Sequence, residues 1–108
     1  MAQDFRRYTS NNVGTGATTV FTANSFDAIV GISLANVHTA AITVSCYIND
    51  YSNYIHLVKD VSIPAGSALQ VLDGGAKFVV QSGDALKVIS DTASSLDVWV
   101  SAVDAISS

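Results

Sequence analysis

The sequence is short of charged side chains and contains no glutamate. Only 13% of its 108 residues are charged, and Asp supplies the entire acidic set, whereas an ordinary soluble domain carries about a quarter charged residues. Five Lys and Arg stand against nine acidic residues, so the formal net charge is -4. Such a chain lacks the cationic field that non-specific binding to nucleic acid backbones or anionic lipid headgroups requires. We therefore expect no nucleic acid partner and no membrane partner.

Cysteine is nearly absent. Cys46 is the one cysteine of the sequence, so an internal disulfide is excluded, and so is a structural zinc site, which needs about four Cys or His ligands. Because Cys46 alternates with Val44 and Ile48, we expect it to be a small buried hydrophobe. No apolar signal-peptide core follows Arg6 and Arg7, which favours synthesis in a reducing bacterial cytoplasm.

The motifs of catalysis and cofactor binding are also missing. No Gly-x-Ser-x-Gly nucleophile elbow occurs, and the candidate bases are the widely separated His38 and His56. The run Gly14-Thr15-Gly16 lacks the lysine and the helix of a phosphate loop, which leaves it as flexible backbone. The sequence thus predicts a protein that is not an enzyme and that has no catalytic residues and no cofactor.

One predicted turn offers oxygen ligands that would suit calcium. Asn49, Asp50 and Asn53 cluster there, and Asp73 precedes a pair of glycines further on. The sequence has no twelve-residue loop with a bidentate Glu, and Asn and Asp also favour turns by hydrogen bonding to the nearby backbone. Turn chemistry is the simpler interpretation, so we predict no metal site.

What the sequence does have is a recurring pattern of strand formers separated by turn residues. The runs follow one another at the 8–12-residue spacing of a sandwich or barrel, and none has helical periodicity. We therefore predict a single all-β domain, an antiparallel β-sandwich that is jelly-roll-like, with an immunoglobulin-like order as the alternative. The eight predicted strands are 18–23, 26–35, 41–49, 54–63, 67–72, 77–81, 84–90 and 96–103.

Some of these strands carry finer predictions. The run 26–35 places Phe26, Ala28, Val30, Ile32 and Leu34 on one inward face by alternation. The neighbouring runs 41–49 and 54–63 are predicted to pair as a hairpin. The short runs at 67–72, 77–81 and 84–90, divided by glycine turns, predict a tight meander.

The ends of the chain read differently from its middle. Residues 1–17 are polar and glycine-containing, which predicts an extended N-terminal arm; residues 18–104 form the sandwich, and 105–108 form a short tail. Arg6 and Arg7 lie in the arm, where they could make bidentate contacts with carboxylates of a neighbouring subunit. A solvated terminus is the alternative interpretation of the two arginines.

Aromatic residues mark candidate interface positions. Trp99 alternates onto the face of its strand that also carries polar side chains, and Tyr47, Tyr51 and Tyr54 gather around the predicted hairpin. Large aromatic residues on partly polar surfaces are typical of protein interfaces. For Trp99 the alternative is a second, smaller core beneath a loop or the arm.

Several segments, taken in order, resemble a group of small structural proteins of tailed phages, including those of marine cyanophages. The resemblance covers nearly the whole chain and consists of strands and turns without a catalytic signature, so no functional residue is carried over. It implies a virion β-sandwich that packs as a symmetric homo-oligomer. The segments are GISLAN (31–36), YIND (47–50), LVKDVSIPAG (57–66), LQVLDGG (69–75), QSGDALKV (81–88) and SSLDV (94–98).

The expected function that follows is a capsid decoration or cement protein located in the virion. Its partners would be copies of itself, with a trimer as one candidate, and the major capsid protein or other virion proteins. A tail, neck or baseplate component is the alternative. A third hypothesis is a carbohydrate-binding module that contacts the host through Trp99 and the tyrosines.

Overall fold

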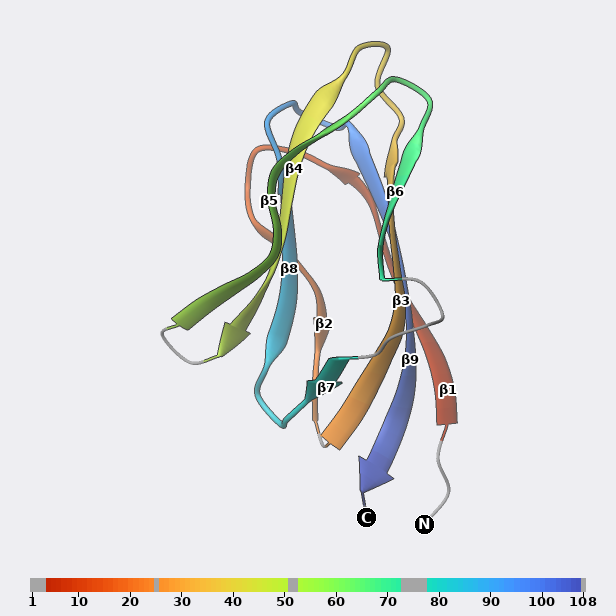
Figure 1. Cartoon of the computed structure of the whole chain (residues 1–108), viewed down its shortest axis with the longest axis vertical. Coiled ribbons are helices and arrows are strands. Elements are labelled where there is room, and N and C mark those ends of the chain that lie inside the picture. Colours follow the sequence, from red (N-terminus) through yellow and green to blue (C-terminus); the bar gives the residue numbers. More distant parts are fainter. Residues whose placement is uncertain (1–3, 25, 51–52, 73–77, 108) are drawn as a thin grey trace.

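The computed structural model describes residues 4–24, 26–50, 53–72 and 78–107. Two antiparallel sheets pack face to face (Figure 1), and the predicted all-β sandwich is confirmed. Within the described residues no helix is long and apolar enough to cross a membrane. The strands of the described chain are β1 (Asp4–Val13), β2 (Thr18–Thr22), β3 (Phe26–Asn36), β4 (Ile42–Asp50), β5 (Asn53–Ile63), β6 (Ala68–Leu72), β7 (Phe78–Val80), β8 (Ala85–Ser90) and β9 (Leu96–Ser107).

The two sheets have the strand order of a jelly roll. The five-stranded sheet runs β1-β9-β3-β6, with the short β7 also paired to β3, and the four-stranded sheet runs β2-β8-β4-β5. The pairs are nested, since β1 pairs with β9, β2 with β8, β3 with β6 and β4 with β5. A long double-stranded ribbon that rolls up on itself gives this order. The strand order is therefore that of the predicted jelly roll and not that of the immunoglobulin-like alternative.

Strands β6, β7 and β8 do not form the predicted meander. β6 and β7 lie one after the other along β3, opposite residues 32–35 and 27–29 respectively. β8 crosses to the other sheet, where it pairs with β2 and β4. The turn signal before β8 is real, because Gly83 has a φ of 96°. A turn fixes a change of direction, however, and not whether the strands on its two sides pair.

The predicted N-terminal arm is in part an edge strand of the sandwich. Residues 4–10 of β1 pair with β9 in unbroken register, and Val13 at its end is buried in the core. The other β1 side chains from Phe5 onward are exposed or half-buried. Tyr8 packs against the core, with its ring centroid 4.3 Å from that of Phe21, and backbone pairing with β9 holds the rest of the strand. The boundary predicted at residues 17 and 18 is corrected. β9 likewise continues through most of the predicted tail.

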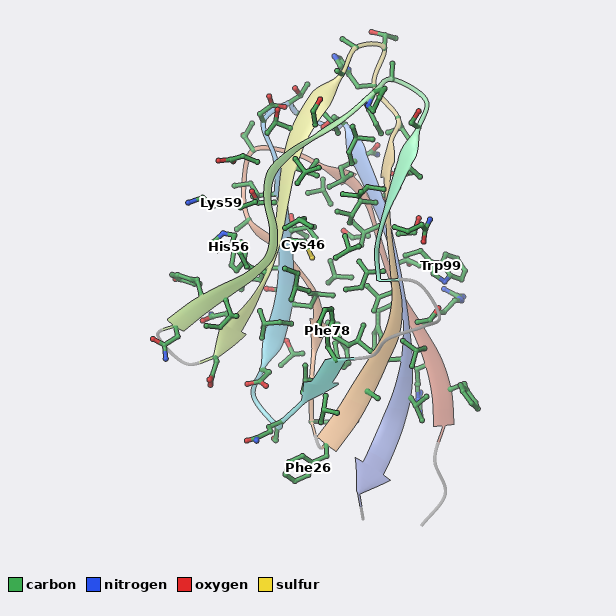
Figure 2. All side chains as sticks on the ribbon, in the orientation of Figure 1. Phe26, Cys46, His56, Lys59, Phe78 and Trp99 are labelled. Atoms are coloured by element: carbon green, nitrogen blue, oxygen red, sulfur yellow. The ribbon has the colours of Figure 1, made fainter. Side chains whose placement is uncertain are left out.

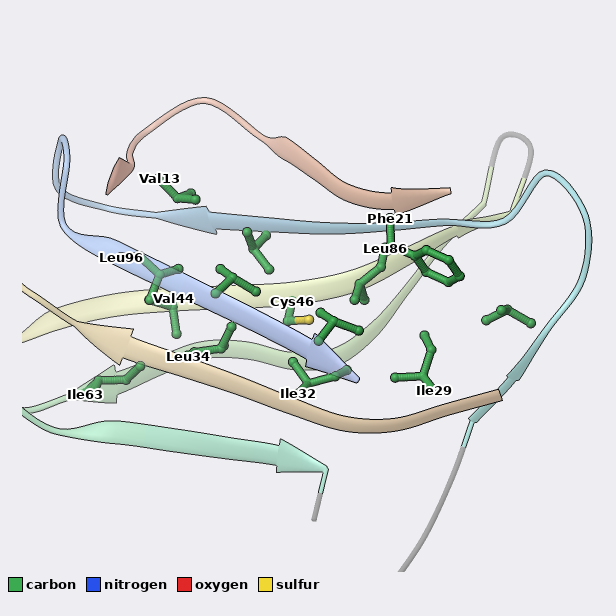
Figure 3. Packing of buried hydrophobic residues seen from close by; sticks show 14 of the residues in the cluster. Val13, Phe21, Ile29, Ile32, Leu34, Val44, Cys46, Ile63, Leu86 and Leu96 are labelled. Atoms are coloured by element: carbon green, nitrogen blue, oxygen red, sulfur yellow. The ribbon is translucent and has the colours of Figure 1, made fainter. Parts of the chain in front are cut away.

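The core lies between the sheets and takes one face of nearly every strand, as Figure 3 shows. β8 alternates strictly, with Leu86 and Val88 fully buried, and β4 contributes Ile42, Val44 and Cys46. Burial of such side chains stabilises the fold by about 1.5–3 kcal/mol each relative to exposure. Cys46 is accordingly a packed core side chain, as its position in the sequence predicts.

The predicted inward face of β3 holds for Ala28, Ile32 and Leu34, which are buried, but not for Phe26. Ile32 and Leu34 belong to the core, but Phe26 is 45% exposed, while Ile29 from the opposite set is fully buried. The register between β3 and β9 shifts between Ile29 and Gly31. An irregularity of this kind inserts a residue and reverses the alternation, which strict period-two reasoning cannot foresee.

Four loops meet at one end of the sandwich, at the top of Figure 1, which we call the anchored end. These loops comprise residues 14–17, 37–41, 64–67 and 91–95. The buried Asn36 ties two of them together, because its Nδ2 donates to the carbonyl oxygens of Ala40 and Ile63, both at 2.9 Å. Its Oδ1 accepts from the backbone N–H of His38 at 2.8 Å.

A second set of contacts joins the other two loops of the anchored end. The hydroxyl oxygens of Ser90 and Ser95 lie 2.6 Å apart, and Ser95 Oγ donates to the carbonyl of Thr92 at 2.7 Å. The backbone N–H of Ser90 donates to the carbonyl of Gly14 at 3.0 Å. A Cβ at Gly14 would come within 3.2 Å of Ala93 Cα, so glycine permits this close approach of the two loops.

The opposite end, which we call the open end, contains the turn of residues 81–84 and both ends of the described chain (Figure 1). There Gly83 N donates to the carbonyl of Ala23, and Ala23 N donates to the carbonyl of Asp84, both at 2.8 Å. The hairpin of β4 and β5 leans away from the sandwich on this side. Its two strands pair antiparallel, from Ile42 opposite Ile63 to Asp50 opposite Asn53, which confirms the predicted hairpin of residues 41–49 and 54–63.

Candidate interaction surfaces

A shallow groove of about 610 Å³ lies on the outer face of the five-stranded sheet, over β1, β9 and β3. Trp99 lines it and is 51% exposed. In the register of the sheet, Trp99 lies between Thr9 of β1 and Ser33 of β3. The guanidinium carbon of Arg7 lies 5.4 Å from the centre of the indole ring. This is cation–π distance, so Arg7 and Trp99 orient one another.

Polar side chains from the same three strands complete the groove. Asn11, Asp97 and Ser33 line it. Asp97 is fixed because its Oδ1 accepts the backbone N–H of Asn12 at 3.1 Å. Ser33 Oγ accepts from the amide nitrogen of Gln70 at 3.1 Å. The groove therefore offers both donors and acceptors, held by strands and not by loops.

A second surface lies on the outer face of the β4–β5 hairpin. The rings of Tyr47 and Tyr54 meet edge to face with centroids 5.5 Å apart, and the imidazole of His56 lies 5.1 Å from Tyr47. Tyr54 is 61% exposed. Ile55, one residue along, points to the other side of the hairpin and is also exposed, at 56%. The leaning hairpin thus presents apolar surface on both sides.

The structure brings some of the predicted interface residues together and separates others. Trp99 and Arg7 are in contact, but Arg6 alternates to the opposite side of β1, toward the four-stranded sheet. Tyr47 and Tyr54 contact one another on the other outer face of the sandwich; Figure 2 shows their neighbour His56 and Trp99 on opposite sides with Cys46 between. A single site containing Trp99 and the tyrosines is therefore excluded, and Tyr51 lies outside the described residues.

Trp99 does not sit in a second core beneath a loop. It is half exposed on the outer face of its sheet, next to β1. Sequence reasoning missed the groove's other members, because Thr9, Asn11 and Ser33 are ordinary strand and turn residues until pairing aligns them. It also missed Phe5, which is 85% exposed. The signal in the sequence was that Phe5 is an apolar residue within a polar segment.

The residues considered above for reactive or metal-binding chemistry have structural roles. Burial raises the pKa of the Cys46 thiol to about 12, so the reactive thiolate is suppressed at neutral pH. Asp50 lies opposite Asn53 at the end of the β4–β5 ladder, in keeping with the turn interpretation, and Asp73 lies outside the described residues. Within the described residues, no three His, Cys, Asp or Glu side chains come close enough to hold a metal ion.

No protein-family model matches the sequence, and no curated protein matches it. The structure is similar to a solved chain of Bacillus endospore appendages, which are described as a novel family of disulfide-linked pili. The TM-score is 0.55 at 15% sequence identity, and the match covers 94% of this chain and 84% of that chain. A likeness at this identity shows a shared sandwich fold alone.

Proposed function

We propose that this protein is a structural subunit that associates in many copies, and that it serves as a capsid decoration or cement protein of a tailed phage. The resemblance of its strand-and-turn pattern to small phage structural proteins supports the location. One observation carries the association: two of the sheet-edge strands, β1 and β5, expose large apolar side chains. Phe5 on β1 is 85% exposed, and Tyr54 and Ile55 on β5 are 61% and 56% exposed.

Sheet edges are the natural place for such association. An edge strand presents unpaired N–H and C=O groups, and proteins that stay monomeric usually interrupt their edges with bulges, proline or charges. β5 is interrupted, since its register with β4 shifts around Cys46 and Asp60 has a φ of 53°. Residues 4–10 of β1 run without a shift. This is the longest run without a shift among the edge strands β1, β2, β5 and β6. β1 also carries Arg6 and Arg7 and has a shift after Ser10, but its long regular run makes it the better edge for pairing with a neighbour, and Phe5 would be buried by it.

Association in this proposal is non-covalent. Cys46 lies in the core with none of its surface exposed, so within these 108 residues no thiol is placed to form an intersubunit disulfide of the kind named for the Bacillus pili. Apolar burial and strand pairing must then supply the binding energy. Repetition over a closed shell multiplies modest contacts through avidity.

A matched pair of variants tests the association. Phe5→Ser removes an exposed aromatic side chain from the β1 edge. Val37→Ser removes an aliphatic side chain, 51% exposed, from the loop after β3. Loss of one hot-spot side chain weakens binding about tenfold or more. Sedimentation velocity over a range of concentrations should show this weakening for Phe5→Ser alone. Equal association constants for both variants would refute the role of the β1 edge.

The location is tested separately by cryo-electron microscopy of purified particles. Density for the sandwich on the head, at a copy number that matches the shell, is the expected result. Absence of the protein from the particle would reject the virion assignment while leaving the association test intact.

A second candidate is a subunit of a filament or tube, such as a phage tail component. The shared fold with a pilus chain favours this candidate, and so does the geometry of the edges. β1 and β5 are different surfaces, so contact between β1 of one copy and β5 of the next would be head-to-tail, and head-to-tail contacts give rings or open filaments. Rings or filaments of the purified protein in negative stain would support it.

A further inference from the structure

The groove over β1, β9 and β3 has a chemistry that edge association does not use. It combines one half-exposed indole, one guanidinium, one carboxylate and short hydroxyl and amide side chains. We propose that this groove is a binding site for a neutral hexose of a glycan, which stacks on the face of the Trp99 indole that Arg7 does not cover. The proposal concerns Trp99 alone among the aromatic residues, because the tyrosine cluster occupies the other face of the sandwich.

The chemical match is with both sides of a pyranose ring. Such a ring has a face of C–H groups, which packs on an aromatic surface, and a rim of hydroxyl groups, each of which donates and accepts. Arg7 and Asn11 supply donors, and Thr9 supplies a hydroxyl that does both. Asp97 already accepts one backbone hydrogen bond, but a carboxylate has about four acceptor sites, so it retains capacity for a sugar hydroxyl.

The sheet holds these groups in place before any ligand arrives. Thr9, Trp99 and Ser33 are register partners on three adjacent strands, and adjacent strands lie about 4.8 Å apart. The three positions therefore span about 9.6 Å from β1 to β3, a distance that can accommodate one sugar ring across the strands. On the β3 side the residues opposite Asp97 and Ser101 are Ala35 and Gly31, whose small size leaves room beside the indole.

Other occupants fit the groove less well. A peptide that adds to a sheet needs an edge, whereas the groove lies on a face. A phosphate-bearing ligand would meet one guanidinium, one carboxylate and a chain of net charge -4. Arg7 and Asp97 balance one another, which suits an uncharged polyol. A second copy of the chain remains the competing occupant, and the test separates it.

Trp99 is the one tryptophan of the sequence, so its fluorescence reports directly on the groove. Titration with methyl glycosides of glucose, galactose, mannose and N-acetylglucosamine should give a saturable change for at least one of them, with a dissociation constant on the order of 1 mM. Glycan-array binding should identify the same sugar. No response to any glycoside up to about 50 mM, fifty times that constant, together with a blank array, would overturn the proposal.

Variants followed by two-dimensional NMR titration locate the binding. Trp99→Ala should weaken it at least tenfold, Trp99→Phe should restore part of the loss, and Asp97→Asn should weaken it several-fold. The control Tyr54→Ala, on the opposite face, should bind as the unchanged protein does. Binding that survives Trp99→Ala would refute the site.

The competing occupant gives a distinct signal. If a second copy fills the groove, the Trp99 emission maximum will shift with protein concentration in the absence of sugar, and added glycoside will not reverse it. That result would overturn the sugar site. The Phe5→Ser measurement is independent of both outcomes, because Phe5 does not line the groove.

Discussion

The two ends of this sandwich are built differently. At the anchored end, buried or half-buried side chains bind backbone groups of neighbouring loops, and Asn36 alone joins three backbone groups. At the open end, the turn of residues 81–84 is held by backbone hydrogen bonds and by Asp84 Oδ2, which accepts the N–H of Gln81 at 2.9 Å. The anchored end is therefore held by side chains that bridge its loops, while the other end carries the leaning hairpin, exposed aromatic surface and the buried side chain of Asp27.

The two ends should differ in how much stability they lose when one hydrogen-bonding side chain is removed. A buried side chain that satisfies several backbone groups is expensive to remove, because those groups then lose their partners in a place that water does not reach. A turn held by exposed contacts loses little, since water replaces the lost partner. We expect local opening to begin at the open end.

The largest expected effect is that of Asn36→Ala. The substitution leaves the carbonyl groups of Ala40 and Ile63 and the N–H of His38 without their side-chain partner, and should lower the free energy of unfolding by about 3 kcal/mol. Urea denaturation measures it. The control Thr39→Ala, at an exposed position of the same loop, should stay within about 0.5 kcal/mol. A loss below about 1 kcal/mol for Asn36→Ala would show that the anchored end has other support.

Ser95→Ala should come next. Ser95 Oγ donates to the Thr92 carbonyl, so the hydroxyl of Ser90 is the donor in the 2.6 Å contact between the two serines. Loss of this fully buried hydroxyl should cost about 1.5 kcal/mol. The double variant Ser90→Ala, Ser95→Ala should be less destabilised than the sum of the two single variants, because they share a hydrogen bond. Strict additivity would mean that the network is not coupled.

Asp84→Ala is the matched change at the open end. It removes one exposed hydrogen bond to Gln81 N, and the free energy of unfolding should fall by about 0.5 kcal/mol. The same urea experiment applies. If Asp84→Ala proves as costly as Asn36→Ala, the proposed difference between the two ends is wrong.

The smallest effect is a pH dependence at the anchored end. The backbone N–H of Thr43 and then the hydroxyl of Thr92 lower the pKa of Asp91 from its ordinary 3.8. A lowered pKa means that the ionised carboxylate stabilises the fold above pH 3.8, and that this contribution is lost as the pH falls through the lowered pKa. Asp91→Asn should therefore lose less stability on acidification than the unchanged protein, as measured by urea midpoints. Identical acid dependence would contradict this role.

Much of the sandwich could be predicted from the sequence, because alternation and turn residues report burial. β4 and β8 show this, with Val44, Cys46, Leu86 and Val88 all inward. β1 could not be predicted, since only Tyr8 and Val13 of its side chains pack against the core, and two apolar residues five positions apart do not give a period-two pattern. The reversal of the inward and outward positions at Ile29 could not be predicted either, because no residue type in the sequence identifies a bulge there.

The candidate sites were predictable only as single residues. Trp99 and Tyr54 were expected at an interface, and both are exposed. That they lie on opposite faces follows from the strand order, which places β9 and β5 in different sheets. The partnership of Arg7 with Trp99 depends on the register of β1 against β9, and register is a property of paired strands that one sequence alone does not fix.

The nesting of the first strand with the last has a consequence for biosynthesis. Asp4 lies opposite Asp104, so β1 has no partner until β9 leaves the ribosome, and at about 5–20 residues per second that interval lasts several seconds. The pairing of β1 with β9 must wait until β9 has been made, and long-range pairing of this kind makes folding slow relative to helical domains of this size. During that interval the nascent chain exposes the apolar faces of both sheets. Yield in the cell should consequently depend on temperature and chaperone supply more steeply than the stability of the finished sandwich does.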